Sequence, residues 1–248
     1  MKKKSEKKLA LVTGASRGIG KAIATALLEA GYEVACGYRD NRKGAEELEK
    51  NFPAAKAVRI DTRDRKTVRS AVAAAQKHFG HSVAIVVNNA AIADERPMEE
   101  ITDADWDKVL ETNLRGPFVV VQETLSGMKA AQWGRIINIV SIGGQWGGMR
   151  QVHYAAAKAG LINFTHSLAR LYSREGITAN AVSPGLVGTD MAQKELKTKA
   201  GKQKAAAIPV GRIAYPREIA AAVLYLCSED AAYVTGHTLN VNGGMYFQ

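Results

Sequence analysis

Short apolar runs alternate with longer segments of mixed polarity along almost the whole chain. The short runs are rich in valine, isoleucine and alanine, which is typical of buried strands, whereas the longer segments repeat apolar residues at helical spacing. Strands are predicted at 9–12, 33–37, 55–60, 83–87, 135–140, 178–182 and 238–241. Because apolar strands that alternate with amphipathic helices form a parallel sheet covered on both faces, the pattern predicts an α/β fold.

The segments between these strands predict six helices. They span 21–30, 41–51, 63–79, 102–128, 152–174 and 215–226. The fourth begins at Thr102, whose hydroxyl can cap the helix, and has Asp103 and Asp105 in its first turn, where acids are favoured. This helix carries Asn113, and we expect a kink at Pro117 because proline lacks the N–H group that a helix interior uses.

The composition suits one globular domain. The chain has 248 residues, of which 46% are hydrophobic, and this is enough for one substantial core. Without a repeat, linker or low-complexity segment, we expect a single domain over 8–248 behind a basic tail over 1–7. No apolar run approaches the ~18 residues of a membrane span. Cys36 and Cys227 lie in apolar contexts, so we expect separate core thiols of a cytoplasmic protein, with no disulfide and no metal site.

The net charge of +10 is distributed unevenly. The first eight residues carry five lysines and one glutamate, and the segment 191–207 carries another five lysines and one glutamate. A nucleic-acid surface needs a broad basic face with interleaved aromatic residues, which two short clusters do not provide. We therefore expect no nucleic-acid partner.

A glycine-rich turn follows the first predicted strand and leads directly into a helix. The turn runs from Thr13 to Gly20 and contains Gly14 and Gly18. Glycines at these positions let the backbone approach a pyrophosphate, which then faces the free N–H groups of the helix N-terminus. The strand before and the helix after the turn are the context that this motif requires, so the sequence predicts a dinucleotide site.

Tyr154 and Lys158 lie four residues apart in a predicted helix, so they share one face. A lysine ammonium beside a phenol favours the phenolate and lowers its pKa from about 10. Reaching neutrality takes roughly 4 kcal/mol, which one close cation and a charged cofactor ring can supply. The pair then forms a general acid for a carbonyl oxygen while hydride reaches the carbon. The alternative is an ordinary exposed pair, and other motifs must decide between the two.

The motifs taken together resemble the short-chain dehydrogenase/reductase family from about residue 8 to residue 246. The matching features are Thr13, Gly14, Gly18, Ile19, Gly20, Asn88, Asn89, Ala90, Asn113, Ser141, Tyr154, Lys158, Pro184 and Gly185. The resemblance implies a Rossmann-type doubly wound parallel sheet in a single domain, with the cofactor across the carboxyl ends of the strands. It also implies an enzyme.

The resemblance assigns roles to four residues. Tyr154 is the expected proton donor, and Lys158 lowers its pKa and binds the nicotinamide ribose. Ser141 holds the substrate carbonyl, and Asn113 positions a water that links Lys158 to solvent. A turn or cap role for Ser141 and a structural role for Asn113 are the alternatives.

The predicted cofactor is NADP(H). Family members that select NAD end their second strand with an acid, whereas this chain has Tyr38 followed by Arg39. Arg17 projects toward the same place, and two guanidinium groups suit a phosphate. Asp40 is the evidence against this reading. The resemblance implies cofactor contacts at Gly14, Ser16, Arg17, Gly18, Ile19, Gly20, Tyr38, Arg39, Asp61, Thr62, Asn89, Ala90, Tyr154, Lys158, Pro184, Gly185, Val187 and Thr189.

The chain departs from the family pattern at two positions near the cofactor. Ala91 stands where a glycine closes the motif that begins at Asn88, and Ala84 stands where an aspartate is common. An added methyl group at Ala91 would tighten the cofactor site without abolishing binding.

The closest subgroup is the 3-oxoacyl-[acyl-carrier-protein] reductases, which the chain resembles at 141–144, 154–161, 209–212 and 241–246. The resemblance implies NADPH-dependent reduction of a 3-oxoacyl thioester by a homotetramer, with residues 243–248 at a subunit contact. The basic segment 191–207 would cover the substrate and attract an acidic acyl carrier protein or the phosphates of coenzyme A. Expected substrate contacts are Ser141, Gly143, Trp146 and Met149.

Two alternatives remain at the level of sequence. Two positions where family members use arginine for carrier docking are Gln132 and Glu175 here. This difference leaves room for a carbonyl reductase or alcohol dehydrogenase acting on a free small-molecule ketone, such as a polyketide, steroid, sugar or quinone. A non-catalytic NADPH-binding protein is the remaining alternative, and the complete set of four predicted catalytic residues argues against it.

Overall fold

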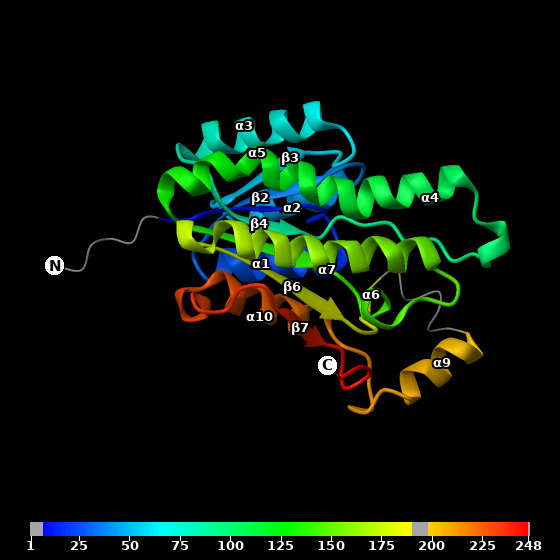
Figure 1. The fold of residues 1–248 in the computed structure, drawn as a ribbon. Helices are drawn as coiled ribbons and strands as arrows, with labels where there is room; N and C mark the ends of the chain where they lie inside the picture. Colours follow the sequence, from blue (N-terminus) through cyan, green and yellow to red (C-terminus); the bar gives the residue numbers. More distant parts are fainter. Residues whose placement is uncertain (1–6, 190–197, 248) are drawn as a thin grey trace.

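A seven-stranded parallel sheet forms the centre of the molecule (Figure 1). The computed structural model describes residues 7–189 and 198–247. Within them the strand order is β3-β2-β1-β4-β5-β6-β7, and every pairing is parallel. The strands are β1 (Leu9–Val12), β2 (Glu33–Tyr38), β3 (Ala55–Arg59), β4 (Val83–Asn88), β5 (Gly134–Ile139), β6 (Ile177–Pro184) and β7 (Thr238–Val241). The predicted doubly wound sheet is confirmed.

Helices cover both faces of the sheet. Two large apolar clusters lie on opposite sides of the strands, one beneath α1, α2 and α10 and the other beneath α3, α5 and α7. The α-helices are α1 (Gly18–Glu29), α2 (Arg42–Asn51), α3 (Arg65–Phe79), α4 (Asp103–Leu110), α5 (Gly116–Ala131), α6 (Gly143–Trp146), α7 (Val152–Tyr172), α9 (Lys199–Ala206) and α10 (Pro216–Cys227). Shorter turns are η1 (Met98–Glu100), η2 (Glu111–Arg115), η3 (Ser173–Glu175) and η4 (Glu229–Ala231).

The strand order reverses direction between β1 and β4. The chain runs outward from β1 through β2 to β3, and then returns to the other side of β1 to build β4 to β7. At such a switch point the loops after the two central strands separate and open a crevice at the carboxyl end of the sheet. The loops after β1 and β4 carry the glycine turn and Asn89, so the fold brings these sequence motifs to one crevice.

The predicted helix over 102–128 is divided into α4, η2 and α5. Thr102 and Asp105 form the capping box at its start, as the sequence indicates. The π-helical turn η2 then precedes α5, whose first turn contains Pro117. Pro117 has no N–H group for the carbonyl oxygen of Asn113, four residues earlier, so the regular α-helical ladder cannot pass through this point. The predicted distortion is confirmed, and it takes the form of a π turn.

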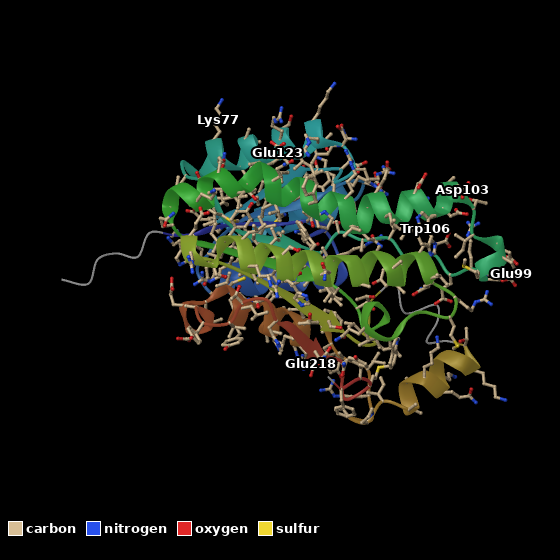
Figure 2. The ribbon with its side chains drawn as sticks, in the orientation of Figure 1. Lys77, Glu99, Asp103, Trp106, Glu123 and Glu218 are labelled. Carbon is tan, nitrogen blue, oxygen red and sulfur yellow. The ribbon has the colours of Figure 1, made fainter. Side chains whose placement is uncertain are left out.

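Polar contacts fix the helices to one another. Glu123 of α5 accepts hydrogen bonds from Arg65 and Arg69 of α3, and Figure 2 shows it on α5, close to α3.

Cys36 and Cys227 are free buried thiols, and burial raises the pKa of each to about 12. These two residues are core residues, as predicted.

The start of α1, the basic segments and the lengths of the helices can also be compared with the sequence predictions. α1 begins at Gly18, three residues earlier than predicted, so the last residues of the glycine turn form part of the helix. The basic tail lies outside the described residues except for its last position, and so do Lys194, Glu195 and Lys197 of the basic segment. Across the described part of the chain, no helix is both long enough and apolar enough to cross a membrane.

Candidate active site

The structure brings Ser141, Tyr154 and Lys158 together at the carboxyl end of β5. The Ser141 hydroxyl, just after β5, hydrogen-bonds to the phenol of Tyr154 on α7. The Nζ atom of Lys158 lies 5.6 Å from the centroid of the Tyr154 ring. The same Nζ atom donates a hydrogen bond of 2.7 Å to the carbonyl oxygen of Ile139, at the end of β5. This bond ties α7 to the strand that positions Ser141.

Burial sets the protonation of the pair. Lys158 is only 2% exposed, and this burial lowers its pKa to about 8. Burial raises the pKa of Tyr154, and the hydrogen bond from Ser141 opposes that rise. The structure thus differs from the sequence prediction of a lowered phenol pKa: the ammonium of Lys158 is directed to the Ile139 carbonyl, and burial is the largest influence on the pKa of Tyr154.

Asn113 lies in the π turn η2, which packs against α7. Its side chain is fully buried and holds the loop after β4: Oδ1 accepts from the Ile92 N–H at 2.9 Å, and Nδ2 donates to the Ile92 carbonyl at 2.8 Å. Any contact from Asn113 to a water beside Lys158 would therefore use its main-chain carbonyl. Pro117 favours this, because it cannot donate an α-helical hydrogen bond to that oxygen.

Asn89 and Thr13 fix the glycine turn. The Thr13 hydroxyl accepts from the N–H groups of Asn89 and Ala90, both at 3.0 Å. The amide of Asn89 donates to the carbonyls of Thr13 and Gly14 at 2.9 and 3.2 Å. A Cβ atom at Gly20 would lie 2.2 Å from the Gly14 carbonyl, so only glycine allows α1 to start this close to the turn. Gly14 and Gly18 have φ values of +67° and +55°, which glycine alone adopts without strain.

The segment after β6 faces the glycine turn. A Cβ atom at Gly18 would lie 3.4 Å from the side chain of Thr189, so these two predicted cofactor residues border one space. The carbonyl of Pro184 accepts from the N–H of Ile142, and the N–H of Gly185 donates to Val241. These bonds hold the predicted nicotinamide side of the site between β5 and β7. Val187, a further predicted contact, is buried and bridges to Ala214.

Four charged groups gather at the ends of β2 and β3. The guanidinium of Arg39 pairs with Asp40 at 2.6 Å, and that of Arg63 pairs with Asp61 at 2.6 Å. The hydrogen bond from Arg63 lowers the pKa of Asp61, and the charge of Arg39 adds to this effect. Arg17 is exposed and forms no ion pair with any residue of the described chain. Next to this group, Thr62 lies so close to Gly116 that a Cβ there would be 2.8 Å from its hydroxyl oxygen.

Two of the predicted substrate residues, Gly143 and Trp146, lie on the short helix α6, whereas Ser141 precedes this helix and Met149 follows it. The Ser141 hydroxyl accepts from the N–H of Gly143 at 3.1 Å, so α6 starts directly from the proposed carbonyl-binding residue. A Cβ at Gly144 would lie 2.8 Å from the backbone of Lys158, so glycine lets α6 pack on α7. Trp146 is 51% exposed and Met149 is 97% exposed. Neither side chain belongs to the buried core of the single chain.

Comparison with known proteins identifies the family. A family model described as enoyl-(acyl carrier protein) reductase, of the short-chain dehydrogenase type, matches residues 14–246. The chain belongs to the short-chain dehydrogenase/reductase family. It is 43% identical over 242 residues to a 3-oxoacyl-[acyl-carrier-protein] reductase of Vibrio cholerae, covering 97% of this chain and 98% of that protein. It is 42% identical over 242 residues to an acetoacetyl-CoA reductase of Rhizobium meliloti, covering 97% and 99%.

Short-chain dehydrogenases use a nicotinamide cofactor, and the residues present fit one. Arg17 precedes α1 without capping it, so the first-turn N–H groups of this 12-residue helix have no side-chain cap and suit a pyrophosphate. A Cβ atom at Gly14 would meet the side chain of Asn89 at 3.0 Å, and one at Gly18 would meet Thr189 at 3.4 Å, so glycine keeps the turn close to both neighbours. Ala91 causes no backbone strain, because Gln132 is the one residue other than glycine with a positive φ in the described chain.

Two residues near the site were missed by the sequence reasoning. Arg63 forms an ion pair with Asp61. The sequence over 61–65 contains two aspartates and two arginines, and it does not show which of them pair. His153 immediately precedes Tyr154, is fully buried, and has no hydrogen-bond partner for either ring nitrogen among the described residues. Its burial follows from α7 packing against α4, which carries Trp106 on the side toward α7 (Figure 2). Only its place next to Tyr154 could have drawn attention to it.

We expect Tyr154→Phe to lower kcat by a factor of about 10² to 10⁴, because the phenol proton of a general acid is lost while the ring is kept. The measurement is steady-state turnover together with cofactor titration by fluorescence. Cofactor affinity should stay within about threefold of wild type. A variant that keeps full turnover would contradict the assignment of Tyr154 as proton donor.

We expect Lys158→Met to raise the free energy of unfolding by about 2 kcal/mol at pH 7. A pKa lowered from 10.5 to about 8 corresponds to roughly 3 kcal/mol of destabilisation, and the Ile139 carbonyl left unpaired returns about 1 kcal/mol. The folded chain binds fewer protons than the unfolded chain between these pKa values, so wild-type stability rises with pH across that interval. Urea unfolding at pH 7 and pH 10 should show the gap between the two proteins shrinking at the higher pH.

The control for this comparison is Lys108→Met, at an exposed position of α4. It should leave the stability unchanged at both pH values. A Lys158→Met protein that is less stable than wild type at pH 7 would mean that the buried ammonium stabilises the fold.

Proposed function

We propose that the protein reduces a 3-oxoacyl thioester, bound to acyl carrier protein or coenzyme A, to the 3-hydroxyacyl form with NADPH. The observation that carries this proposal is that Ser141, Tyr154 and Lys158 meet at the end of β5: a hydrogen bond joins Ser141 to Tyr154, and the buried ammonium of Lys158 lies beside the Tyr154 ring. The relatives that carry the names of 3-oxoacyl-carrier-protein reductase and acetoacetyl-CoA reductase support the substrate class.

The residues of the site have separate tasks in this reaction. Ser141 donates a hydrogen bond to the substrate carbonyl oxygen and places it beside the phenol of Tyr154. Tyr154 gives its proton to that oxygen as the carbonyl carbon is reduced, so the C=O group becomes CH–OH. The bound nicotinamide supplies the hydride. Lys158 stabilises the phenolate that remains, and the main-chain carbonyl of Asn113 holds the water through which the proton is replaced.

The charges at the ends of β2 and β3 support NADP over NAD. Tyr38 places no carboxylate where the 2′ position of the adenosine ribose is expected. Arg39 and Arg17 could each bind a phosphate at that position. Asp40 is largely exposed and forms an ion pair with Arg39 at 2.6 Å, so the guanidinium offsets the negative charge of this carboxylate. A 2′-phosphate would replace Asp40 as the partner of that guanidinium, with a stronger, bidentate contact.

We expect Arg39→Ala to weaken NADPH binding about tenfold or more, with little effect on NADH, because one phosphate-binding guanidinium is lost. Asp40→Asn is the matched variant: it frees Arg39 and should leave NADPH affinity equal or tighter. The measurement is quenching of protein fluorescence by each cofactor without substrate. Equal losses for NADPH and NADH in Arg39→Ala would count against a 2′-phosphate contact.

The carrier of the acyl group is argued from charge. Lys199 and Lys202 of α9 are exposed at the same end of the molecule as α6 (Figure 1), where they can attract an acidic carrier protein or the phosphates of coenzyme A. Glu175, one of the two positions where family members use arginine, is paired with Lys129 at 3.3 Å, at the far end of the sheet. Because Glu175 offsets the charge of Lys129 on that surface, α9 is the favoured docking element.

We propose a homotetramer as the assembly and the cytoplasm as the location. Contact with a second subunit is supported by a hollow of about 680 Å³ between α4, α5 and α7, which is lined by Asp107, Leu110, Glu111, Leu114, Arg115, Phe118 and Phe164. Phe118 is 42% exposed there, a surface that a second subunit would cover. The two buried free thiols are in keeping with a reducing compartment.

A second candidate is the reduction of a free ketone. The exposed Trp146 favours it, because an aromatic wall also suits a ring-shaped substrate. The description of the matching family model adds a third activity to test, the reduction of an enoyl thioester.

The first experiment is NADPH oxidation with acetoacetyl-CoA, beside a panel of free ketones and crotonoyl-CoA, and repeated with NADH. We expect turnover with the 3-oxo thioester and NADPH that exceeds every other combination at least tenfold. Activity on a free ketone alone would identify a carbonyl reductase, and activity on crotonoyl-CoA alone would identify an enoyl reductase. Repeating the assay with a carrier-linked substrate at low and high salt tests the basic helix, since a flat KM would exclude charge-driven docking.

A further inference from the structure

The C-terminal turn lies against the predicted substrate wall. The ring of Tyr246 meets the ring of Trp146 edge to face, with centroids 6.2 Å apart and planes at 84°. In Figure 1 the end of the chain lies beside α6 and α9, beyond the carboxyl end of β7. The sequence predicted a subunit contact for this segment. In the single chain it already contacts the loop that begins at Ser141.

The turn is firmly attached to its own chain. Asn242, which is 7% exposed, accepts from the N–H of Gly244 and donates to the carbonyl of Tyr246 at 3.0 and 3.1 Å. The carbonyl of Gly243 accepts from the N–H of Val210. Gly243 and Gly244 have positive φ values, which fold the chain sharply back toward α6. Tyr246 is therefore held in place by its own backbone, so it can serve as a wall.

Large apolar side chains stay exposed in the segments that carry or adjoin this aromatic pair. Trp146 and Met149 come from the loop after β5, Val210 from the segment after α9, and Phe247 from the C-terminal turn; they are 51%, 97%, 60% and 81% exposed. Gly244 joins the last two segments, because a Cβ there would lie within 3.5 Å of both Pro209 and Phe247. An apolar surface contributed by three segments is costly in water and marks a binding site.

The position of this surface identifies its occupant. α6 is joined to Ser141 by the bond from Gly143 and to Lys158 by the close packing of Gly144, so the wall continues directly from the reacting groups. None of the four exposed side chains carries a charge, whereas the neighbouring α9 presents lysines. Phosphates of the thioester carrier suit the lysines, and the apolar acyl chain beyond the reacting carbonyl suits the aromatic wall.

We propose that Trp146 and Tyr246, with Met149 and Phe247 beside them, bind the acyl chain of the substrate and make the enzyme select chains longer than four carbons. This inference rests on the proposed thioester reduction. Each methylene group that leaves water on binding favours the complex by roughly fourfold. An acetoacetyl group has only one methyl group beyond its reacting carbonyl, so it has little apolar surface to place against the wall.

The test compares kcat and KM for coenzyme A thioesters of 3-oxo acids with four, eight and twelve carbons. We expect kcat/KM of the wild-type enzyme to rise at least tenfold from four to twelve carbons. Tyr246→Ala and Trp146→Ala should each lose about tenfold on the twelve-carbon substrate, through KM, and keep the four-carbon activity. Tyr246→Phe retains the ring and should retain the preference. Tyr233→Ala, a fully exposed tyrosine after η4, is the matched control.

Each other outcome overturns a distinct statement. Turnover with the same preference in wild type and both alanine variants would overturn the acyl-chain site alone. Equal losses on all chain lengths, with a smaller assembly in sedimentation, would identify the C-terminal turn as a subunit contact and overturn it too. If the wild-type enzyme reduces no thioester of any length, the proposed function fails, and this inference fails with it.

Discussion

The burial of the Lys158 ammonium against the Ile139 carbonyl is the constraint on which the site depends. One hydrogen bond of 2.7 Å joins α7, which carries Tyr154, to the end of β5, two residues before Ser141. The bond also sets the electrostatics, because the charge that it holds in place has little hydration and its pKa is lowered to about 8. Stability is given up at this point for geometry, which is a common feature of active sites.

The cofactor side of the crevice depends on close backbone approach. α1 can begin beside the strand end only because Gly20 has no side chain to meet the Gly14 carbonyl, and Asn89 then locks the turn with two hydrogen bonds. The result is a rigid bed with open N–H groups. At the adenosine end the opposite principle operates: Arg39 is already paired with Asp40, so a bound phosphate must replace an existing partner there. Under the proposed preference for NADP, a 2′-phosphate would compete with Asp40 for the guanidinium of Arg39.

Much of the fold follows from the sequence because its signals are local. The strands and the glycine turn each lie in one stretch, so periodicity and a motif suffice to find them. The features that escaped prediction depend on distant neighbours or on small energy differences. Pro117 predicted a distortion of the helix. That the distortion is a π turn containing Asn113 could not be predicted, because it depends on how both α4 and α5 pack. The raised pKa of Tyr154 depends on burial that no pattern reports, and the pairing of Arg63 with Asp61 depends on side-chain geometry.

The loop after β5 and the C-terminal turn are far apart in the sequence but lie against each other at the mouth of the site. Trp146 and Tyr246 are a hundred residues distant in the chain, and only the return of β7 to the edge of the sheet brings their rings together. Because β7 pairs beside β6, whatever follows it must emerge at the carboxyl end of the sheet, next to α6. The topology thus obliges the last residues of the chain to border the crevice. Tyr246 and Phe247 belong to none of the buried apolar clusters, so substitutions there would alter the border of the crevice and leave the core packing intact.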